Sequence, residues 1–170
     1  SPGRSTPGEG GRDLYVLSPR PLGCRYHNLR KGELNMAEKR PDRVLGPLND
    51  TFWEYCTKRE FRLQKCDGCG HHQWPPTPIC SECLDEHLTW TELSGKGTIK
   101  TFIYFERQYF PECEPPWPVI MVQLNEGPWF ISNPKDISEQ DMKIGSPVKV
   151  SFLDCEDGAG QFKLPVFGKA

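Results

Sequence analysis

The sequence predicts a mainly β protein with an N-terminal helix, in which a zinc ribbon is followed by a five-stranded OB-fold barrel. Two observations lead to this prediction. Two Cys-x2-Cys pairs, at 66–69 and 80–83, are separated by ten residues. Five short segments rich in β-branched and aromatic residues then follow, divided by turns that contain glycine or proline. With almost no helical pattern between these segments, a small closed or partly closed barrel is the best candidate.

The paired cysteines predict a metal site. In a chain without a secretion signal, paired knuckles indicate metal rather than disulfides. A Cys-x2-Cys turn lets both sulfurs reach one ion at about 2.3 Å, and two such turns complete a tetrahedron. We therefore expect one structural Zn²⁺, with iron as the alternative ion, bound by Cys66, Cys69, Cys80 and Cys83. Four thiolates leave no open position for catalysis.

Residues next to these ligands are expected to shape the site. Gly68 and Gly70 give the first knuckle its backbone freedom, and prolines within 75–78 stiffen the following loop. His71 and His72 are expected at the surface or around the ligands, because the cysteines already fill the tetrahedron.

The remaining cysteines, including Cys56, Cys113 and Cys155, show no pairing pattern. We expect plain thiols, since the glutamates on either side of Cys113 raise rather than lower the pKa of a thiol. No Cys-His-Asn or Ser-His-Asp arrangement can be assembled from this sequence, so no catalytic residues are expected in this chain.

Four regions follow one another along the chain. Residues 1–35 are rich in Gly, Pro, Arg and Ser and are expected to be an upstream extension or leader before a natural start at Met36; a native disordered tail is the alternative. Residues 36–63 form an N-terminal helical segment, residues 64–90 the ribbon and residues 91–170 the OB-fold.

Helical spacing extends over residues 47–63, with Asn49 or Asp50 as the expected cap. Trp53 on this helix packs either on the protein's own core or on a partner, and the sequence leaves both roles open. Between the third and fourth strands, residues 137–144 form a short helix or turn. The expected strands are 98–106, 119–124, 129–132, 148–152 and 162–166.

Alternation places Ile99, Ile103 and Phe105 on one face of the first barrel strand. Pro165 restricts the last strand to an edge or an irregular end. Four aromatic residues are candidates for stacking on a ligand, with core or interface positions as the alternative: Tyr104, Trp117, Trp129 and Phe130.

Charge disfavours nucleic acid as a partner, and hydropathy disfavours a membrane span. Residues 1–35 carry six of the 21 basic and three of the 23 acidic residues, so the rest has 15 and 20 and a net charge of −5. A sequence-independent grip on nucleic acid needs clustered positive charge. There is no run of eighteen apolar residues and no secretory signal peptide, so we expect a cytoplasmic protein with no membrane span.

From Leu48 to Phe167 the sequence resembles a family of small accessory proteins that join a helical segment, a rubredoxin-like zinc ribbon and an OB-fold. The order and spacing of many elements carry this resemblance: Phe52-Trp53, Lys65-Cys66-Asp67-Gly68-Cys69-Gly70, Pro75-Pro76, Cys80-Ser81-Glu82-Cys83, Trp90, Ser94-Gly95-Lys96-Gly97, Pro118, Ile144-Gly145 and Leu164-Pro165-Val166-Phe167.

The resemblance implies a partner. Such proteins are obligate small subunits of thiolase-fold enzymes, which make or cleave carbon–carbon bonds next to a coenzyme A thioester. One similar protein is the small subunit of an aromatic-degradation thiolase such as benzoylsuccinyl-CoA thiolase. The implied function is a non-catalytic subunit in a hetero-oligomer, with coenzyme A or acyl-CoA at the partner interface. Lys100 and Arg107 are expected to be solvated charges rather than ligands of a coenzyme A phosphate.

Three other functions compete with this one. A single-stranded nucleic-acid binder requires a basic groove, which the net charge disfavours. A stand-alone acyl-CoA or acyl-carrier binding protein predicts coenzyme A binding by the isolated chain. A rubredoxin-like electron carrier predicts iron-loaded protein with reversible redox chemistry.

Overall fold

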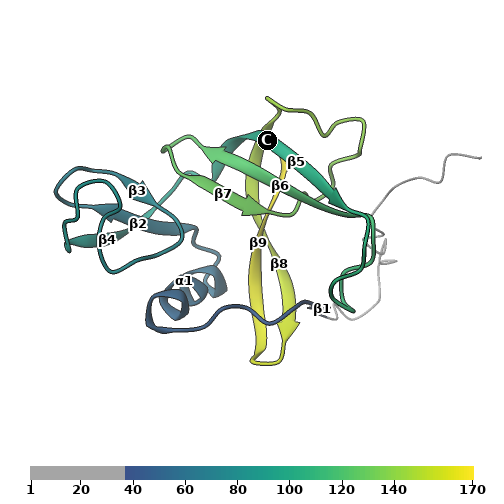
Figure 1. Ribbon diagram of the computed structural model, residues 1–170, viewed down its shortest axis with the longest axis horizontal. Coiled ribbons are helices and arrows are strands. Elements are labelled where there is room, and N and C mark those ends of the chain that lie inside the picture. Colours follow the sequence, from purple (N-terminus) through teal and green to yellow (C-terminus); the bar gives the residue numbers. More distant parts are fainter. Residues whose placement is uncertain (1–36) are drawn as a thin grey trace, which may run out of the picture.

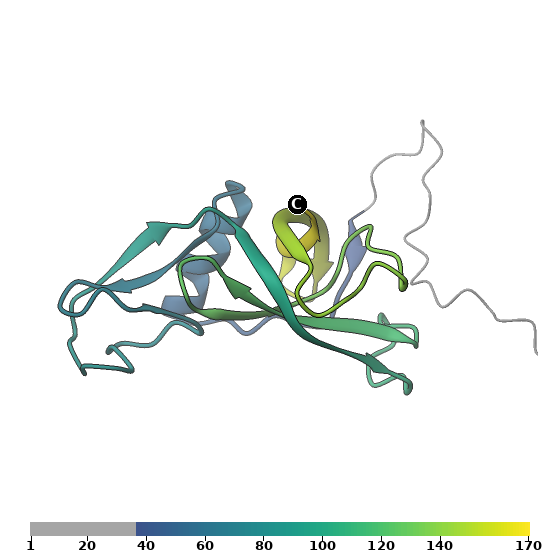
Figure 2. The ribbon, with the colours of Figure 1, turned by 90° about the horizontal axis from the view of Figure 1, so that it is seen from above.

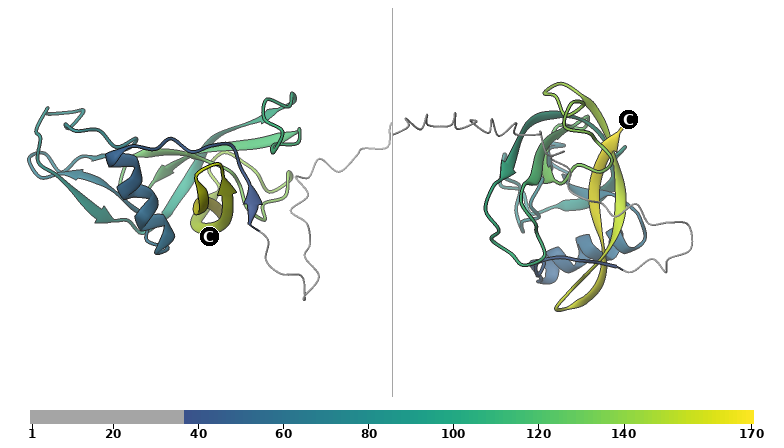
Figure 3. Two further views of the ribbon diagram at one scale, coloured as in Figure 1. Left: turned by 90° about the horizontal axis from the view of Figure 1, so that it is seen from below. Right: turned by 90° about the vertical axis from the view of Figure 1, so that its right-hand side faces the viewer.

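The computed structural model describes residues 37–170, so the expectation for residues 1–35 lies outside this part of the chain. Two β structures lie side by side, with helix α1 against both of them (Figure 1). The ribbon extends from one end of the larger β structure (Figure 2). Viewed from that structure's other end, its strands curve around a common centre (Figure 3, right).

The first strand, β1 (Glu38–Lys39), is short and pairs in parallel with β8. Helix α1 (Pro47–Thr57) follows. The expected cap at Asn49 or Asp50 is wrong, because Gly46 is the N-cap residue. Asp50 still contributes there, since its Oδ1 accepts a hydrogen bond from the Gly46 N–H at 3.1 Å and its charge lies in the positive first turn.

The helix is six residues shorter than the spacing predicted. Lys58 caps its C-terminus, and Arg59 takes a left-handed conformation with φ of 61°. The next residues pair as a strand, which ends the helical hydrogen bonding. Trp53 is half-buried against Phe162 at 5.4 Å between ring centroids, so it packs on the protein's own core.

The ribbon is a three-stranded antiparallel sheet in the order β3-β2-β4. Its central strand carries the first ligand cysteine at its last position. The strands are β2 (Arg62–Cys66), β3 (His72–Gln73) and β4 (Leu88–Glu92).

The larger structure is the predicted OB-fold barrel. β5 pairs with β6 and β8, β6 pairs with β7, and β8 pairs with β9. A bridge between Pro134, just after β7, and Phe167 in β9 joins the two ends of this ring. Residues 137–144, expected as a short helix or turn, contain turns. The strands are β5 (Lys96–Phe105), β6 (Trp117–Leu124), β7 (Trp129–Ser132), β8 (Pro147–Asp157) and β9 (Gly160–Lys169).

A bulge in β5 overturns the predicted common face. Ile99 lies opposite Val122, but Thr101 lies opposite Met121, so Lys100 is an extra residue in the ladder. An extra residue reverses the direction of every later side chain. Ile99 is fully buried, whereas Ile103 is 51% exposed.

One hydrophobic core joins ribbon and barrel. Phe61 and Leu63 enter it from the ribbon side, and Phe130 and Phe167 enter it from the barrel. The Phe61 and Phe130 rings lie 5.2 Å apart, edge to face, an arrangement that aromatic pairs favour. No helix within residues 37–170 is long and apolar enough to cross a membrane.

Candidate metal centre and exposed apolar face

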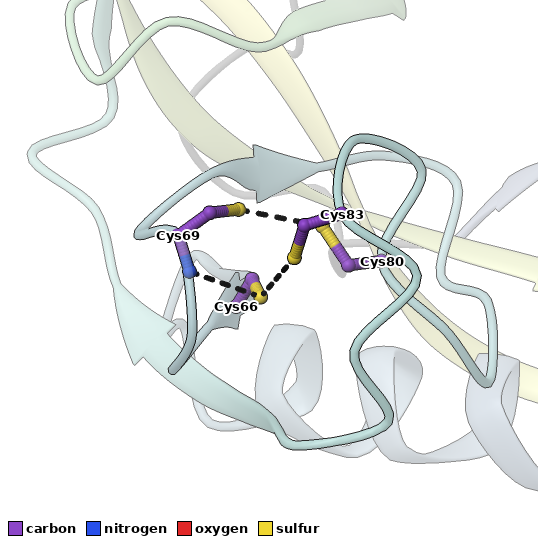
Figure 4. A group of neighbouring side chains, drawn as sticks. All are labelled: Cys66, Cys69, Cys80 and Cys83. Atoms are coloured by element: carbon purple, nitrogen blue, oxygen red, sulfur yellow. Dashed lines mark hydrogen bonds between the residues drawn. The ribbon is translucent and has the colours of Figure 1, made fainter.

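The four predicted cysteines come together at the end of the ribbon (Figure 4). Their sulfur atoms all lie within 4.8 Å of one another. The Sγ atoms are 3.5 Å apart for Cys66 and Cys83, and 3.6 Å apart for Cys69 and Cys80. Ligands at about 2.3 Å from a tetrahedral zinc ion are separated by about 3.8 Å, so the sulfur spacing fits such an ion.

The two knuckles share one backbone design. In the first, the Gly70 N–H donates to the Cys66 carbonyl at 2.8 Å; in the second, the Leu84 N–H donates to the Cys80 carbonyl at 3.1 Å. The donor residue has positive φ in both, 75° at Gly70 and 64° at Leu84. The prediction for Gly70 is thus confirmed, since glycine adopts this conformation without strain.

Gly68 acts through its lack of a side chain. A Cβ atom added there would lie 2.4 Å from Asp85 Oδ2. Asp85 in turn accepts hydrogen bonds from the His87 backbone N–H at 2.8 Å and shares one with His87 Nδ1 at 2.7 Å. The first knuckle can therefore approach the carboxylate of Asp85, whose backbone carbonyl accepts a hydrogen bond from the Cys80 N–H of the second knuckle at 2.8 Å.

Backbone amides point at the ligand sulfurs. The Cys69 N–H donates to Cys66 Sγ at 3.5 Å, and the Glu82 N–H donates to Cys80 Sγ at 3.4 Å. Backbone donors, that of Cys83 first and that of Glu82 next, lower the pKa of the Cys80 thiol to about 7. A thiolate is the form that binds metal, so these donors favour the binding form at Cys80. At Cys83 a backbone hydrogen bond with Asp85 acts in the same direction, but hydrogen bonds with the thiols of Cys66 and Cys69 raise the pKa to about 12.

Two buried glutamines hold the loop between the knuckles, and no sequence pattern singled them out. Gln73 Nε2 donates to Gln64 Oε1 at 3.1 Å, and Gln73 Oε1 accepts from the Ser81 N–H at 3.0 Å. Gln64 Oε1 also accepts from the Thr77 N–H at 2.9 Å. This network anchors the second knuckle to β2 and β3, in addition to the prolines that were predicted to stiffen the loop.

The residues around the cluster add no further ligand. His71 and His72 are half-buried, outside the group of four sulfurs. Burial is the largest cause of a lowered pKa at His72. A site closed by four thiolates has a structural rather than a catalytic role.

The other described cysteines are poor nucleophiles. Burial raises the pKa of the Cys56 thiol to about 12 and that of the Cys155 thiol to about 11. Burial also raises the pKa of Cys113. Because a thiol reacts as its thiolate, none of these three is activated.

The four candidate aromatics have different positions. Phe130 belongs to the core, which is the alternative to ligand stacking that the sequence left open. Tyr104 is half-buried with its hydroxyl against Met142 Sδ at 3.9 Å, and Trp117 is half-buried beneath the Arg40 guanidinium. Trp129 is 52% exposed.

Trp129 is part of a larger apolar surface on the outside of the barrel. Ladder pairing sets Met121 opposite Ile131, and Val119 opposite Ile103. Ile131 is 60% exposed, and Phe105 lies at the end of the same side of β5. We call the following residues the outer apolar face: Ile103, Phe105, Val119, Met121, Trp129 and Ile131.

Comparison with known proteins identifies the ribbon and the barrel. Residues 53–89 match the family described as ChsH2, rubredoxin-like zinc ribbon domain. Residues 90–153 match the family described as ChsH2, C-terminal OB-fold domain. Together the two matches cover more than half of the chain.

Two curated relatives are subunits of hydratases. A probable enoyl-CoA hydratase alpha subunit of Thermomonospora curvata is 28% identical over 86% of this chain and 46% of its own length. A 3-oxo-4,17-pregnadiene-20-carboxyl-CoA hydratase alpha subunit of Mycobacterium tuberculosis is 27% identical over 69% of this chain and 39% of its own. This chain thus spans less than half the length of either relative.

In two further comparisons, the aligned region covers most of the matched protein. A DUF35 domain-containing scaffold protein of Pyrococcus furiosus is 28% identical over 58% of this chain and 74% of its own length. A chain of the solved structure titled Ltp2-ChsH2(DUF35) aldolase aligns with a TM-score of 0.66 and 27% identity, covering 75% of this chain and 98% of that one. The chain therefore belongs to the DUF35 family, with a ChsH2-type rubredoxin-like zinc ribbon followed by a ChsH2-type OB-fold.

Proposed function

We propose that this protein is a zinc-containing, non-catalytic subunit of a complex that makes or cleaves carbon–carbon bonds of acyl-CoA thioesters, and that its partner is a thiolase-fold catalytic chain. The outer apolar face is the observation that carries the proposal. Large apolar side chains are exposed on β5 and β7, on either side of the half-buried Val119 and Met121 of β6. A continuous apolar surface of this kind marks a protein interface. No catalytic constellation accompanies them within residues 37–170.

The relatives support a role inside a complex. Two are named as alpha subunits of enzymes that act on CoA thioesters, one as a scaffold protein, and one as part of an aldolase. The hydratase subunits are more than twice as long as the part this chain matches. Their activity is therefore not assigned to this chain.

The proposed zinc ion acts on the interface indirectly. Bound by Cys66, Cys69, Cys80 and Cys83, it would fix the ribbon that packs against the inner side of β7. The outer side of β7 presents Trp129 and Ile131. The four sulfurs and the backbone donors that point at them support this assignment.

We further propose an aromatic acyl group, coenzyme A at the partner interface and a cytoplasmic location. These details rest on the resemblance to the small subunits of aromatic-degradation thiolases.

The test is affinity capture of the full chain from its source, with identification of the bound chains and their ratio. A stoichiometric thiolase-fold chain is expected, and its substrate range identifies the acyl group. Recovery of nucleic acid instead would favour an OB-fold binder, and thiolase activity of this chain alone would refute the non-catalytic role.

A pair of variants tests the interface itself. Ile131→Lys places a charge in the outer apolar face and is expected to abolish co-purification with the partner. Ile144→Lys makes the same change at a residue that is 69% exposed but lies outside this face, so binding should persist. Equal binding by both variants would mean that the partner docks elsewhere.

A further inference from the structure

Two lysines beside the outer apolar face are placed in a way that the fold itself does not need. Lys96 of β5 lies directly opposite Lys149 of β8 in the ladder, and both residues are exposed. Like charges directly opposite each other destabilise a sheet. This pair therefore costs the free chain stability unless an anion lies between the two ammonium groups.

The bulge in β5 adds a third lysine to the same surface. Lys100 is the extra residue of the bulge, and it is exposed together with Thr101, which follows it. In a regular strand, one of two consecutive side chains would point to the inner side. The bulge instead leaves Lys100 at the surface next to the pair formed by Thr101 and Met121. We call Lys96, Lys100 and Lys149 the lysine cluster.

No anion of the described part of the chain neutralises the lysine cluster. Its three ammonium groups form no ion pair and no hydrogen bond with any described residue. Two carboxylates on neighbouring segments have other partners. Glu126 Oε1 accepts a hydrogen bond from the Ser94 N–H at 2.7 Å, and Asp141 Oδ2 accepts one from Lys169 Nζ at 2.7 Å. The positive charge of the cluster is therefore available to a ligand.

The lysine cluster and the outer apolar face lie on the same side of the sheet. Thr98, Gln123 and Trp129 lie side by side across β5, β6 and β7, and each is at least partly exposed. Lys96 is two residues from Thr98 on the same strand, so its side chain points to the same side. Strand spacing places Lys96 about 12 Å from Trp129 along the sheet. A protein interface of ordinary size, about 800 Å² per partner, covers both.

We propose that the lysine cluster binds an acidic surface of the catalytic partner, whose carboxylates lie between Lys96 and Lys149 while its apolar side chains cover the outer apolar face. This inference rests on the function proposed above and adds the charge of the partner's surface. Complementary charge at the edge of an interface mainly accelerates association. A protein is favoured over nucleic acid as the occupant, because the chain after residue 35 has a net charge of −5 and three lysines neutralise few phosphates.

Association kinetics test the proposal, with the full 170-residue chain and the catalytic chain recovered by the affinity capture described above. The double variant Lys96→Glu/Lys149→Glu keeps a like-charged pair in the ladder, so its folding cost matches that of the unaltered chain. At about 0.1 M salt its association rate constant should be lower by roughly tenfold or more, while dissociation changes by less than about threefold. At about 1 M salt, where the screening length is about 3 Å, the difference should vanish.

The possible results separate this inference from the proposed function. An unchanged association rate in the double variant would overturn the role of the lysine cluster and leave the proposed function intact. Failure of the unaltered chain to bind any thiolase-fold chain would refute both.

The single variant Lys96→Glu separates binding from folding. It sets opposite charges across the ladder, so the midpoint of urea denaturation should rise, whereas association with the partner should still become slower. A more stable chain that associates at the unaltered rate would contradict the proposal.

Lys39→Glu is the matched control for net charge. It makes the same charge change opposite Glu156, about 23 Å along β8 from Lys149. This separation exceeds the screening length of about 10 Å at 0.1 M salt, so the association rate should stay within about twofold of the unaltered value. Equal slowing by Lys39→Glu and Lys96→Glu would mean that net charge rather than the lysine cluster attracts the partner, and would overturn the proposal.

Discussion

At the scale of single residues, the ligand cysteines do most to define the ribbon. Cys66 and Cys80 are fully buried, whereas Cys69 and Cys83 are exposed, so each knuckle presents one inner and one outer sulfur. The inner sulfur of each knuckle also receives a backbone hydrogen bond. Removing an inner ligand should therefore disturb both the proposed metal and the packing beneath it.

Cys66→Ser is expected to reduce zinc content from about one ion per chain to near zero. The melting temperature should fall by roughly 10 °C or more, because binding of a structural metal contributes directly to folding. Elemental analysis and a thermal melt measure the two effects. Cys113→Ser, at a half-buried thiol outside the cluster, should change neither. A zinc content that survives Cys66→Ser would remove this residue from the ligand set.

The sequence predicted the cysteines but not Gln64 and Gln73, and the reason is physical. Two Cys-x2-Cys pairs place their sulfurs by local backbone geometry, so spacing alone reveals them. A glutamine has no such local signature, because its burial depends on partners that only the folded chain brings together. The backbone N–H groups of Thr77 and Ser81 bond these glutamines. No periodic sequence pattern links these residues to the glutamines that they contact.

At the scale of elements, the sequence pattern predicted the position of β5 but not its bulge. The density of β-forming residues predicted this strand to within a few residues of its bounds. The bulge at Lys100 was not predicted, since an extra residue leaves no mark in an alternating sequence when both faces are apolar. The predicted helix was too long for a related reason. The helix ends through the left-handed backbone conformation of Arg59, which residue type alone does not reveal.

The prediction at this scale concerns Gly97, near the start of β5. A Cβ atom at Gly97 would lie 2.6 Å from the Gln123 carbonyl oxygen and 2.6 Å from Val122 Cγ1. β5 is paired with β6 and β8 at this point, so it cannot move away. Gly97→Ala is thus expected to lower the free energy of unfolding by about 1–3 kcal/mol, measured by urea denaturation.

Gly158→Ala provides the matched control. A Cβ atom there would lie 2.8 Å from Asp42 Oδ1, which belongs to a movable side chain rather than to backbone. The cost should be smaller than at Gly97. If the two substitutions cost the same, the close approach of β5 to β6 would not be what requires glycine at position 97.

At the scale of the whole molecule, Phe130 links the ribbon to the proposed interface. Its ring lies 5.0 Å from that of Trp74 and 5.2 Å from that of Phe61, both on the ribbon side. Its neighbours along β7, Trp129 and Ile131, point to the opposite side and are exposed. Strand β7 thus contacts the ribbon on its inner side and carries part of the outer apolar face on its outer side.

Removal of the proposed metal should consequently affect the entire fold. Chelation is expected to lower the melting temperature of a single cooperative transition, because Phe61 and Leu63 share one core with Phe167. Amide resonances of barrel residues such as Ile99 should broaden together with those of the ribbon. Partner binding should weaken as well, although no ligand cysteine belongs to the outer apolar face. Barrel resonances that stay sharp while ribbon resonances vanish would show that the two β structures fold independently, and that the metal does not support the interface through β7.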